Sequence, residues 1–164
     1  MKEADLVVAI IALNGGKLVG RTRLQKVVYL LHQCGLDGDL EFDYDKFGPF
    51  SADLARATDV AKFLKRINEV KKTGYHEVPY SEFTTNEPPP DRVGNLSADD
   101  VRKALRRMNK YSAVDLELAA TMAFLTEYGV SPEDIVPTVK KLKPVKATDR
   151  HLRRSRKLLK ELGI

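Results

Sequence analysis

The sequence predicts an α+β fold that is predominantly helical, with a winged-helix-like N-terminal unit and a small hairpin packed on a C-terminal helical bundle. Three observations predict it. Apolar residues recur at helical spacing over most of the chain, β-like runs are confined to the first half, and three consecutive prolines separate the halves. We expect a single domain over residues 1–164, made of a winged-helix-like half (1–86), a Pro-rich connector (87–96) and a helical half (97–164).

Two helices are expected to open the chain. The first carries an apolar run over residues 6–13 and ends at the Asn-Gly-Gly of residues 14–16, where left-handed backbone is favourable. The second covers residues 21–34, where apolar residues at three- and four-residue spacing form one stripe that ends at Gly35. Two helices joined by a short Gly-containing turn are compatible with a helix-turn-helix.

The rest of the N-terminal half predicts strands around a third helix. Residues 40–47 alternate between apolar and mostly acidic side chains, which predicts an edge strand with an acidic outer face. A Gly-Pro pair closes this strand, and Ser51 is placed to cap the third helix. The β-like runs over residues 69–72 and 75–84 then predict the hairpin that a winged helix requires.

The helical half has well-marked helix starts. Four residues are placed to cap helices there, namely Ser97, Ser112, Ser131 and Thr148. The helix over residues 113–128 has apolar residues all round its axis, so we expect it to be buried on most sides. It is the predicted central post on which the N-terminal unit packs.

Composition excludes several classes of protein. The 164 residues include 28 Lys+Arg and 23 Asp+Glu, a net charge of +5, and this length buries a core without needing a metal or a disulfide. Because Cys34 is the only cysteine, no internal disulfide framework forms, and we expect a cytoplasmic location. The apolar run of residues 6–13 is too short to cross a bilayer and lacks the features of a secretory peptide, so we expect no membrane partner.

The sequence contains no group of residues typical of catalysis. The three histidines lie on three different predicted elements and share no metal-ligand spacing. A calcium loop beginning at Asp37 would need Gly and Glu where Phe42 and Gly48 stand, so the nearby acids form a solvated strand face or, alternatively, a contact surface for a basic partner. We expect no enzyme activity, no metal and no other cofactor.

Basic charge is concentrated at the C-terminal end. Residues 140–164 hold ten Lys/Arg and two acids, a net of +8, so the rest of the chain carries −3. A basic C-terminal helix favours salt-sensitive binding of nucleic acid, while the alternative is a solvated face on a helix whose leucines pack on the core. The nucleic-acid candidates are Arg150, Arg153, Arg154, Arg156 and Lys157.

A second basic cluster opens the second predicted helix, where a recognition helix would meet DNA. Its members are Lys17, Arg21, Arg23 and Lys26. The leucines and valines that follow indicate a buried helix, and few of its side chains suit base edges, so the pattern only weakly favours sequence-specific reading of DNA.

Two segments carry a resemblance to a known family. The run RLQKVVYLL at residues 23–31 followed by FGPFS at residues 47–51 resembles the Panacea domain, the family of SocA-like antitoxins and phage-associated proteins, and more closely its YwgA-like members. Segments at residues 112–128 and 142–163 extend the resemblance over most of the chain. It implies a binding role without a catalytic set, since Panacea proteins neutralise toxins by direct contact and SocA delivers its toxin to a protease.

We therefore expect a non-enzymatic protein-interaction module, antitoxin-like or proteolytic-adaptor-like, whose partner is a protein such as a toxin. Gln25 and Tyr29, one helical turn apart, are expected to direct polar groups towards the rigid Gly48-Pro49 turn. The alternative is a winged-helix nucleic-acid-binding protein that uses the basic C-terminal helix, and a homo-oligomer is also compatible with the sequence. The expected partner-binding residues are Gln25, Tyr29, Phe47, Gly48, Pro49 and Phe50.

Overall fold

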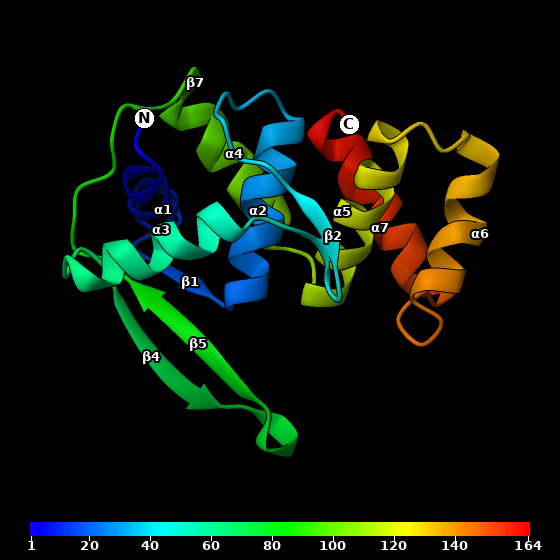
Figure 1. Cartoon of the computed structure of the whole chain (residues 1–164), viewed down its shortest axis with the longest axis horizontal. Coiled ribbons are helices and arrows are strands. Elements are labelled where there is room, and N and C mark those ends of the chain that lie inside the picture. Colours follow the sequence, from blue (N-terminus) through cyan, green and yellow to red (C-terminus); the bar gives the residue numbers. More distant parts are fainter.

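Helices and a projecting hairpin alternate in the N-terminal half of the computed structural model, which describes residues 1–164 (Figure 1). The sheet there has the antiparallel strand order β1-β5-β4, and the β4–β5 hairpin extends away from the body of the molecule. A separate two-stranded hairpin, β2–β3, lies between α2 and α3 in the chain. The elements are α1 (Glu3–Leu13), β1 (Lys17–Val19), α2 (Arg21–Gln33), β2 (Asp43–Asp45), β3 (Gly48–Phe50), α3 (Ala52–Phe63), β4 (Asn68–Thr73) and β5 (Pro79–Thr84).

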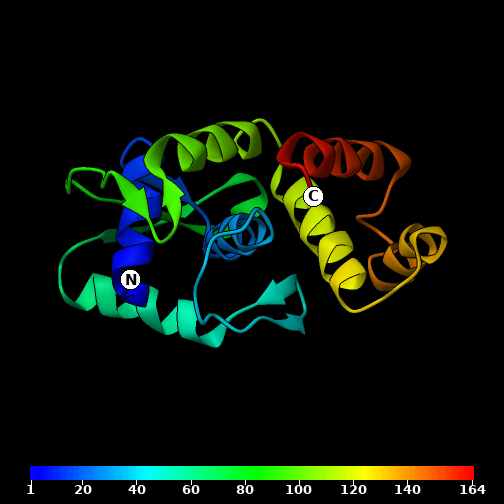
Figure 2. The ribbon, with the colours of Figure 1, turned by 90° about the horizontal axis from the view of Figure 1, so that it is seen from above.

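The C-terminal half is helical apart from one very short hairpin. Seen from above, α4 and α7 lie along one edge of the molecule, and α5 runs beside α7 (Figure 2). The elements are β6 (Arg92–Val93), β7 (Leu96–Ser97), α4 (Ala98–Met108), α5 (Ala113–Glu127), α6 (Pro132–Leu142) and α7 (Asp149–Leu162). The predicted fold class, α+β and predominantly helical, is confirmed. None of these helices has the length and apolar character needed to span a bilayer.

Capping explains where the C-terminal helices begin. Ser97, Ser112 and Thr148 each accept a hydrogen bond from the backbone N–H three residues later, which satisfies one free donor of the first helical turn. Ser131 makes no such bond, and α6 starts instead with Pro132 in its first turn. These helix starts agree with those predicted.

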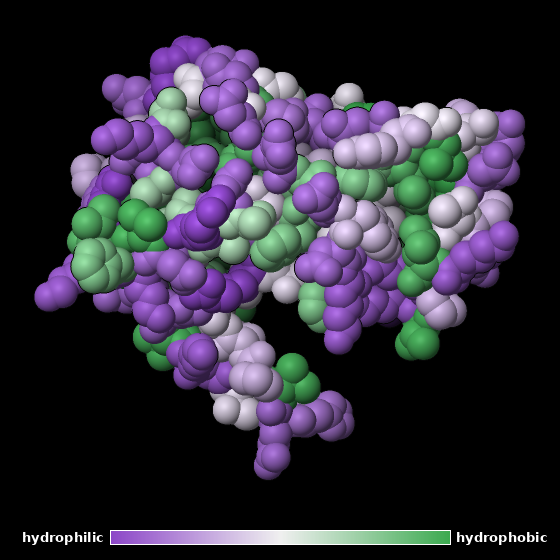
Figure 3. Space-filling model, in the orientation of Figure 1, coloured by the Kyte–Doolittle hydropathy of each residue, from purple (hydrophilic) through white to green (hydrophobic).

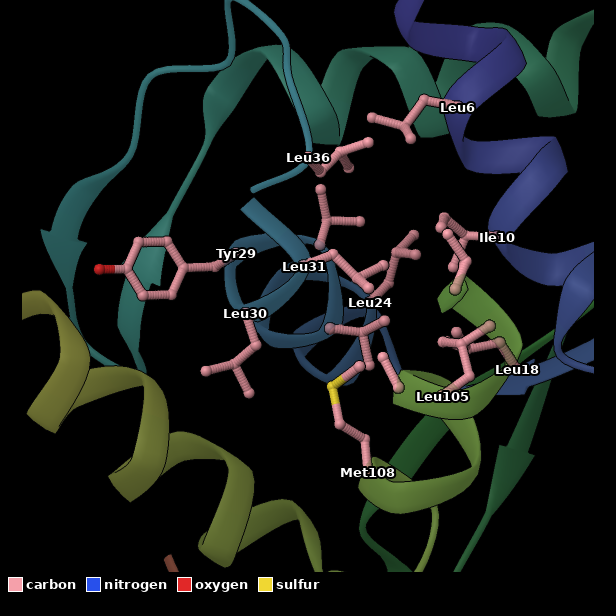
Figure 4. Close-up of a cluster of buried hydrophobic side chains, with 14 of the residues drawn as sticks. Leu6, Ile10, Leu18, Leu24, Tyr29, Leu30, Leu31, Leu36, Leu105 and Met108 are labelled. Carbon is pink, nitrogen blue, oxygen red and sulfur yellow. The ribbon is translucent and has the colours of Figure 1, made fainter. Parts of the chain in front are cut away.

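The core explains why α5 is apolar on all sides. The larger cluster of buried residues gathers side chains from α1, α2, α4 and one face of α5, and Figure 4 shows the part that surrounds α2. A smaller cluster packs the opposite face of α5, through Leu118 and Met122, against α6 and α7. Because apolar neighbours cover both faces, α5 is the buried central helix that its sequence predicts.

The strands differ from the prediction in several places. The first hairpin turns at residues 46–47, and Gly48–Phe50 is its returning strand instead of the turn that ends it. Pro49 is tolerated there because a strand at a sheet edge does not need every N–H donor. Strand β1 was not predicted, and the short β6–β7 hairpin begins inside the predicted connector (87–96) and ends at Ser97. The run expected from residue 75 begins at Pro79, since a short 3-10 turn with left-handed His76 precedes it.

Candidate partner-binding site

Gln25 holds the β2–β3 hairpin at its base. Its amide Nε2 donates to the Ser51 carbonyl at 2.9 Å, and the Ser51 N–H donates back to Gln25 Oε1 at 2.8 Å. The Ser51 hydroxyl also accepts from the N–H of Leu54, which caps α3. One buried glutamine therefore joins α2 to the junction between β3 and α3, and this explains the combination of RLQK and FGPFS in physical terms.

Two buried lysines hold the remainder of the hairpin. The Lys26 ammonium donates to the Pro49 carbonyl at 2.6 Å, and the Lys143 ammonium donates to the Lys46 carbonyl at 2.7 Å. Neither carbonyl is left without a partner inside the protein. The hairpin is therefore anchored from its inner side at three carbonyls, the third being the one that Gln25 binds.

Gly48 allows the hairpin to lie close against α5. Its φ is +89°, a conformation that L side chains rarely adopt, and a Cβ at this position would lie 2.9 Å from the Thr121 hydroxyl oxygen. Thr121 is fully buried on α5, where its hydroxyl donates to the Glu117 carbonyl. Both backbone conformation and space therefore require glycine at residue 48.

The six predicted contact residues have two different environments. Phe47 is 43% exposed and Phe50 is half-buried, whereas the other four, Gln25, Tyr29, Gly48 and Pro49, are buried. Gln25 directs its polar group towards the hairpin as expected. The buried members can therefore shape the hairpin, and the two phenylalanines offer surface to a partner.

Tyr29 does not point to the hairpin turn, so that expectation is wrong. In Figure 4 its ring extends from α2 away from the aliphatic cluster, and its hydroxyl donates to Glu127 Oε2 at 2.9 Å. The ring also packs edge-on against Phe42, with 5.1 Å between the ring centroids. Burial and the hydrogen bond to Glu127 raise the pKa of Tyr29, so the phenol stays protonated. Residues 25 and 29 share one face of α2 but lie about 6 Å apart along its axis, so Gln25 reaches Ser51 while Tyr29 reaches Phe42 and Glu127.

A pocket of about 350 Å³ lies beside the hairpin. Phe47 and Phe50 contribute aromatic walls, Leu24 and Ala55 contribute aliphatic ones, and Lys26 adds a buried charge. The full lining is Arg21, Thr22, Leu24, Gln25, Lys26, Asp45, Phe47, Gly48, Phe50, Ala55 and Thr58. A mainly apolar hollow with a few polar groups is the usual form of a binding site.

Lysines gather around the hairpin. The Lys146 and Lys46 ammonium groups lie 4.9 and 5.3 Å from the centre of the Phe47 ring, within the range of a cation–π interaction. Glu117, which is 3% exposed in its side chain, pairs with Lys143 at 3.3 Å and with Lys146 at 2.7 Å. The sequence did not point to Lys46, Lys143, Lys146 and Glu117 as site residues, although Glu117, Lys143 and Lys146 lie within the segments that carry the family resemblance.

The basic side chains at the start of α2 all bind other groups of the same protein. Arg21 pairs with Glu69 and Asp59, Lys17 pairs with Glu82, and Arg23 donates to the carbonyls of Met108 and Tyr111. Residues 24–31 are all buried. Helix α2 is therefore an inner helix, and its side chains are not free to read bases.

Four of the five nucleic-acid candidates on α7 are exposed and make no ion pair, whereas Arg154 forms an ion pair with Asp115. Its Nε lies 2.8 Å from Asp115 Oδ2, and it also donates to the Lys110 carbonyl. Asp115 is fully buried and accepts from His151 as well, at 2.7 Å. Burial by itself would raise the pKa of Asp115, but the hydrogen bonds from Arg154 and His151 outweigh it and hold the pKa below its usual value. Arg154 thus ties α7 to the start of α5.

The opposite face of α7 packs on the core through Leu152, Ser155 and Leu158. This helix therefore combines an exposed basic face with a buried face, and the predicted packing of its leucines on the core is confirmed. No three or more His, Cys, Asp or Glu side chains are grouped so that they would hold a metal ion.

Fold and site together define an α+β, mostly helical protein with an aromatic hairpin clamped by buried polar side chains. No family model matches the sequence. The chain is similar to a protein of Bacillus subtilis (strain 168) that bears the name "Uncharacterized protein YwgA", with 27% identity over 113 residues, which is 68% of each chain.

Proposed function

We propose that this protein is a non-enzymatic interaction module, antitoxin-like or proteolytic-adaptor-like, whose N-terminal half is a winged helix and whose contact surface is the β2–β3 hairpin. One observation carries the proposal. Phe47 is an exposed aromatic on a hairpin held rigidly by Gln25, Lys26 and Lys143. A pre-organised aromatic anchor beside a pocket is the arrangement that contributes most to protein–protein affinity.

Likeness to the Panacea family supports the same proposal. The segments RLQK and FGPFS form the hairpin clamp, so they constrain a surface that carries the exposed ring of Phe47. If Panacea members bind toxins by direct contact, this hairpin is the surface that a toxin would meet. The similarity to YwgA is compatible with this role, and we assign the chain no catalytic residue.

Co-purification from the native host, with the product of any small adjacent gene as the first candidate, tests the proposal. The tagged wild-type chain is compared with Phe47→Ser and with the control Phe63→Ser. Phe63 is 84% exposed at the far end of α3, and its sequence neighbours Val60 and Leu64 are exposed as well. Figure 3 shows an apolar patch at its left, where the end of α3 lies in Figure 1.

We expect one protein to co-purify in stoichiometric amount with the wild type and with Phe63→Ser, and to be lost with Phe47→Ser. Loss with Phe63→Ser alone would contradict the proposal, because it would assign the contact to the end of α3. Absence of any partner at several salt concentrations would also count against it.

The exposed face of α7 favours a second candidate, binding of nucleic acid. Its four exposed and unpaired cations are Arg150, Arg153, Arg156 and Lys157. On α4, which packs against α7, Lys103 and Arg106 are exposed as well, and so is Lys110 in the turn that follows α4. Basic side chains that share one edge of a molecule are suited to contact phosphates along a duplex.

A further inference from the structure

Lys26 is a buried ammonium without a carboxylate partner. The residue is 2% exposed, and its one hydrogen bond goes to the neutral Pro49 carbonyl. An ammonium has three donors, and a buried charge is normally paired. The nearby Glu117 carboxylate is bound to Lys143 and Lys146 instead. Burial lowers the pKa of Lys26 to about 8, although the charges of Glu117 and Asp45 act in the opposite direction.

The pocket beside Lys26 has one acidic residue in its lining, Asp45. Asp45 forms no ion pair with Lys26 and acts on it only through its charge, which raises the pKa of Lys26. Arg21, at the pocket's other cationic position, already pairs with Glu69 and Asp59. The remaining walls are aromatic, aliphatic or hydroxyl groups, with Phe47 and Phe50 at the hairpin side.

We propose that this pocket binds a carboxylate carried on an apolar group, with the carboxylate against Lys26 and the apolar part against Phe47 and Phe50. The volume of about 350 Å³ is enough for a ring with a short acidic arm. The inference rests on the proposed function in one respect only, since the C-terminus of a partner protein would present a carboxylate beside an apolar side chain. A free small carboxylic acid would present it equally, and the experiment separates the two sources.

The first test needs no variant. Phenylacetate and its uncharged analogue phenylacetamide are titrated into the wild-type protein while the Lys26 Nζ and the Gly48 amide are followed by NMR. We expect phenylacetate, at concentrations up to about 20 mM, to shift both signals and to raise the pKa of Lys26 by about one to three pH units. Phenylacetamide should leave the pKa unchanged. Equal effects of the two ligands, or no effect of either, would overturn the proposal.

Variants then show whether Lys26 supplies the recognition. Lys26→Met should remove the preference for phenylacetate, and Lys103→Met, which alters an exposed lysine on α4, should keep it. If Lys26→Met does not fold, as judged by circular dichroism, the wild-type pKa measurement decides alone. A folded Lys26→Met that still prefers phenylacetate would contradict the assignment.

A pair of peptides distinguishes the sources of the carboxylate. Ala-Gly-Gly-Phe with a free C-terminus is compared with the same peptide amidated at its C-terminus. Binding of the free peptide at least ten times tighter than phenylacetate would indicate a partner's chain end, and equal affinity would indicate a small acid. Equal binding of the amidated peptide would refute both. Since no partner protein is present, failure of the co-purification experiment and failure of this one are separate results.

Discussion

Replacing Gly48 by alanine measures how closely the hairpin packs on α5. The left-handed backbone at residue 48 costs an L residue about 1 kcal/mol. The new Cβ would also meet the Thr121 hydroxyl at 2.9 Å, with the Lys26 side chain and the Glu117 carbonyl each at 3.7 Å. Overpacking of this kind costs about 1–3 kcal/mol, so we expect Gly48→Ala to lower the free energy of unfolding by about 2–4 kcal/mol.

Gly129→Ala is the matched control. Its φ is +84°, close to that of Gly48, but a Cβ there would have no atom within 4 Å. Only the backbone cost of about 1 kcal/mol is expected. Urea unfolding followed by circular dichroism gives both values. In a Thr121→Ala background the two substitutions should cost nearly the same, because the clashing oxygen is gone. Equal costs in the wild-type background would refute the close approach of hairpin and α5.

Three further substitutions test the clamp, the buried aspartate and the basic face. Gln25→Ala should lower the free energy of unfolding by about 3 kcal/mol, measured in urea, because it leaves the buried N–H and carbonyl of Ser51 without partners; a loss below about 1 kcal/mol would contradict the clamp. Asp115→Asn should cost about 3 kcal/mol at pH 7. The pKa of Asp115 is lower in the folded protein than in the unfolded one, so its charge stabilises the fold fully above the unfolded-state pKa of about 4. This stabilisation is lost as the pH falls further, so the unfolding free energies of the variant and the wild type should converge towards about pH 2. A difference that stays constant with pH would contradict this. If α7 binds duplex DNA, fluorescence anisotropy should give a slope of log K against log salt concentration of about −3.6 for its four unpaired cations. The slope should be the same in Arg154→Gln, because Arg154 is paired with Asp115. A weaker slope in that variant would mean that Arg154 also contacts phosphate.

Helix starts were predictable because capping is local. Ser97, Ser112 and Thr148 each bond a backbone N–H only three residues away, so the pattern and its structure occupy the same short segment. The burial of α5 was predictable for a similar reason, since its composition alone requires apolar neighbours on every side.

The pairings across the chain were not predictable from spacing. Arg154 looked like a free cation because its partner Asp115 lies 39 residues earlier, and α5 and α7 must first pack side by side to bring them together. Lys26 was grouped with surface cations for the same reason, although the Pro49 carbonyl holds it inside the protein. Strand β1 has three residues, too few for an alternating pattern to stand out.

The role of the hairpin is tested most directly by the dissociation constant for the co-purified partner. Isothermal titration calorimetry would compare the wild type with Phe47→Ser and with the quadruple variant that replaces Arg150, Arg153, Arg156 and Lys157 by glutamine. We predict that Phe47→Ser weakens binding at least tenfold, a loss of about 1.4 kcal/mol, while the quadruple variant binds with wild-type affinity. Wild-type affinity in Phe47→Ser, together with loss of binding in the quadruple variant, would contradict the hairpin as the contact surface and assign the contact to α7.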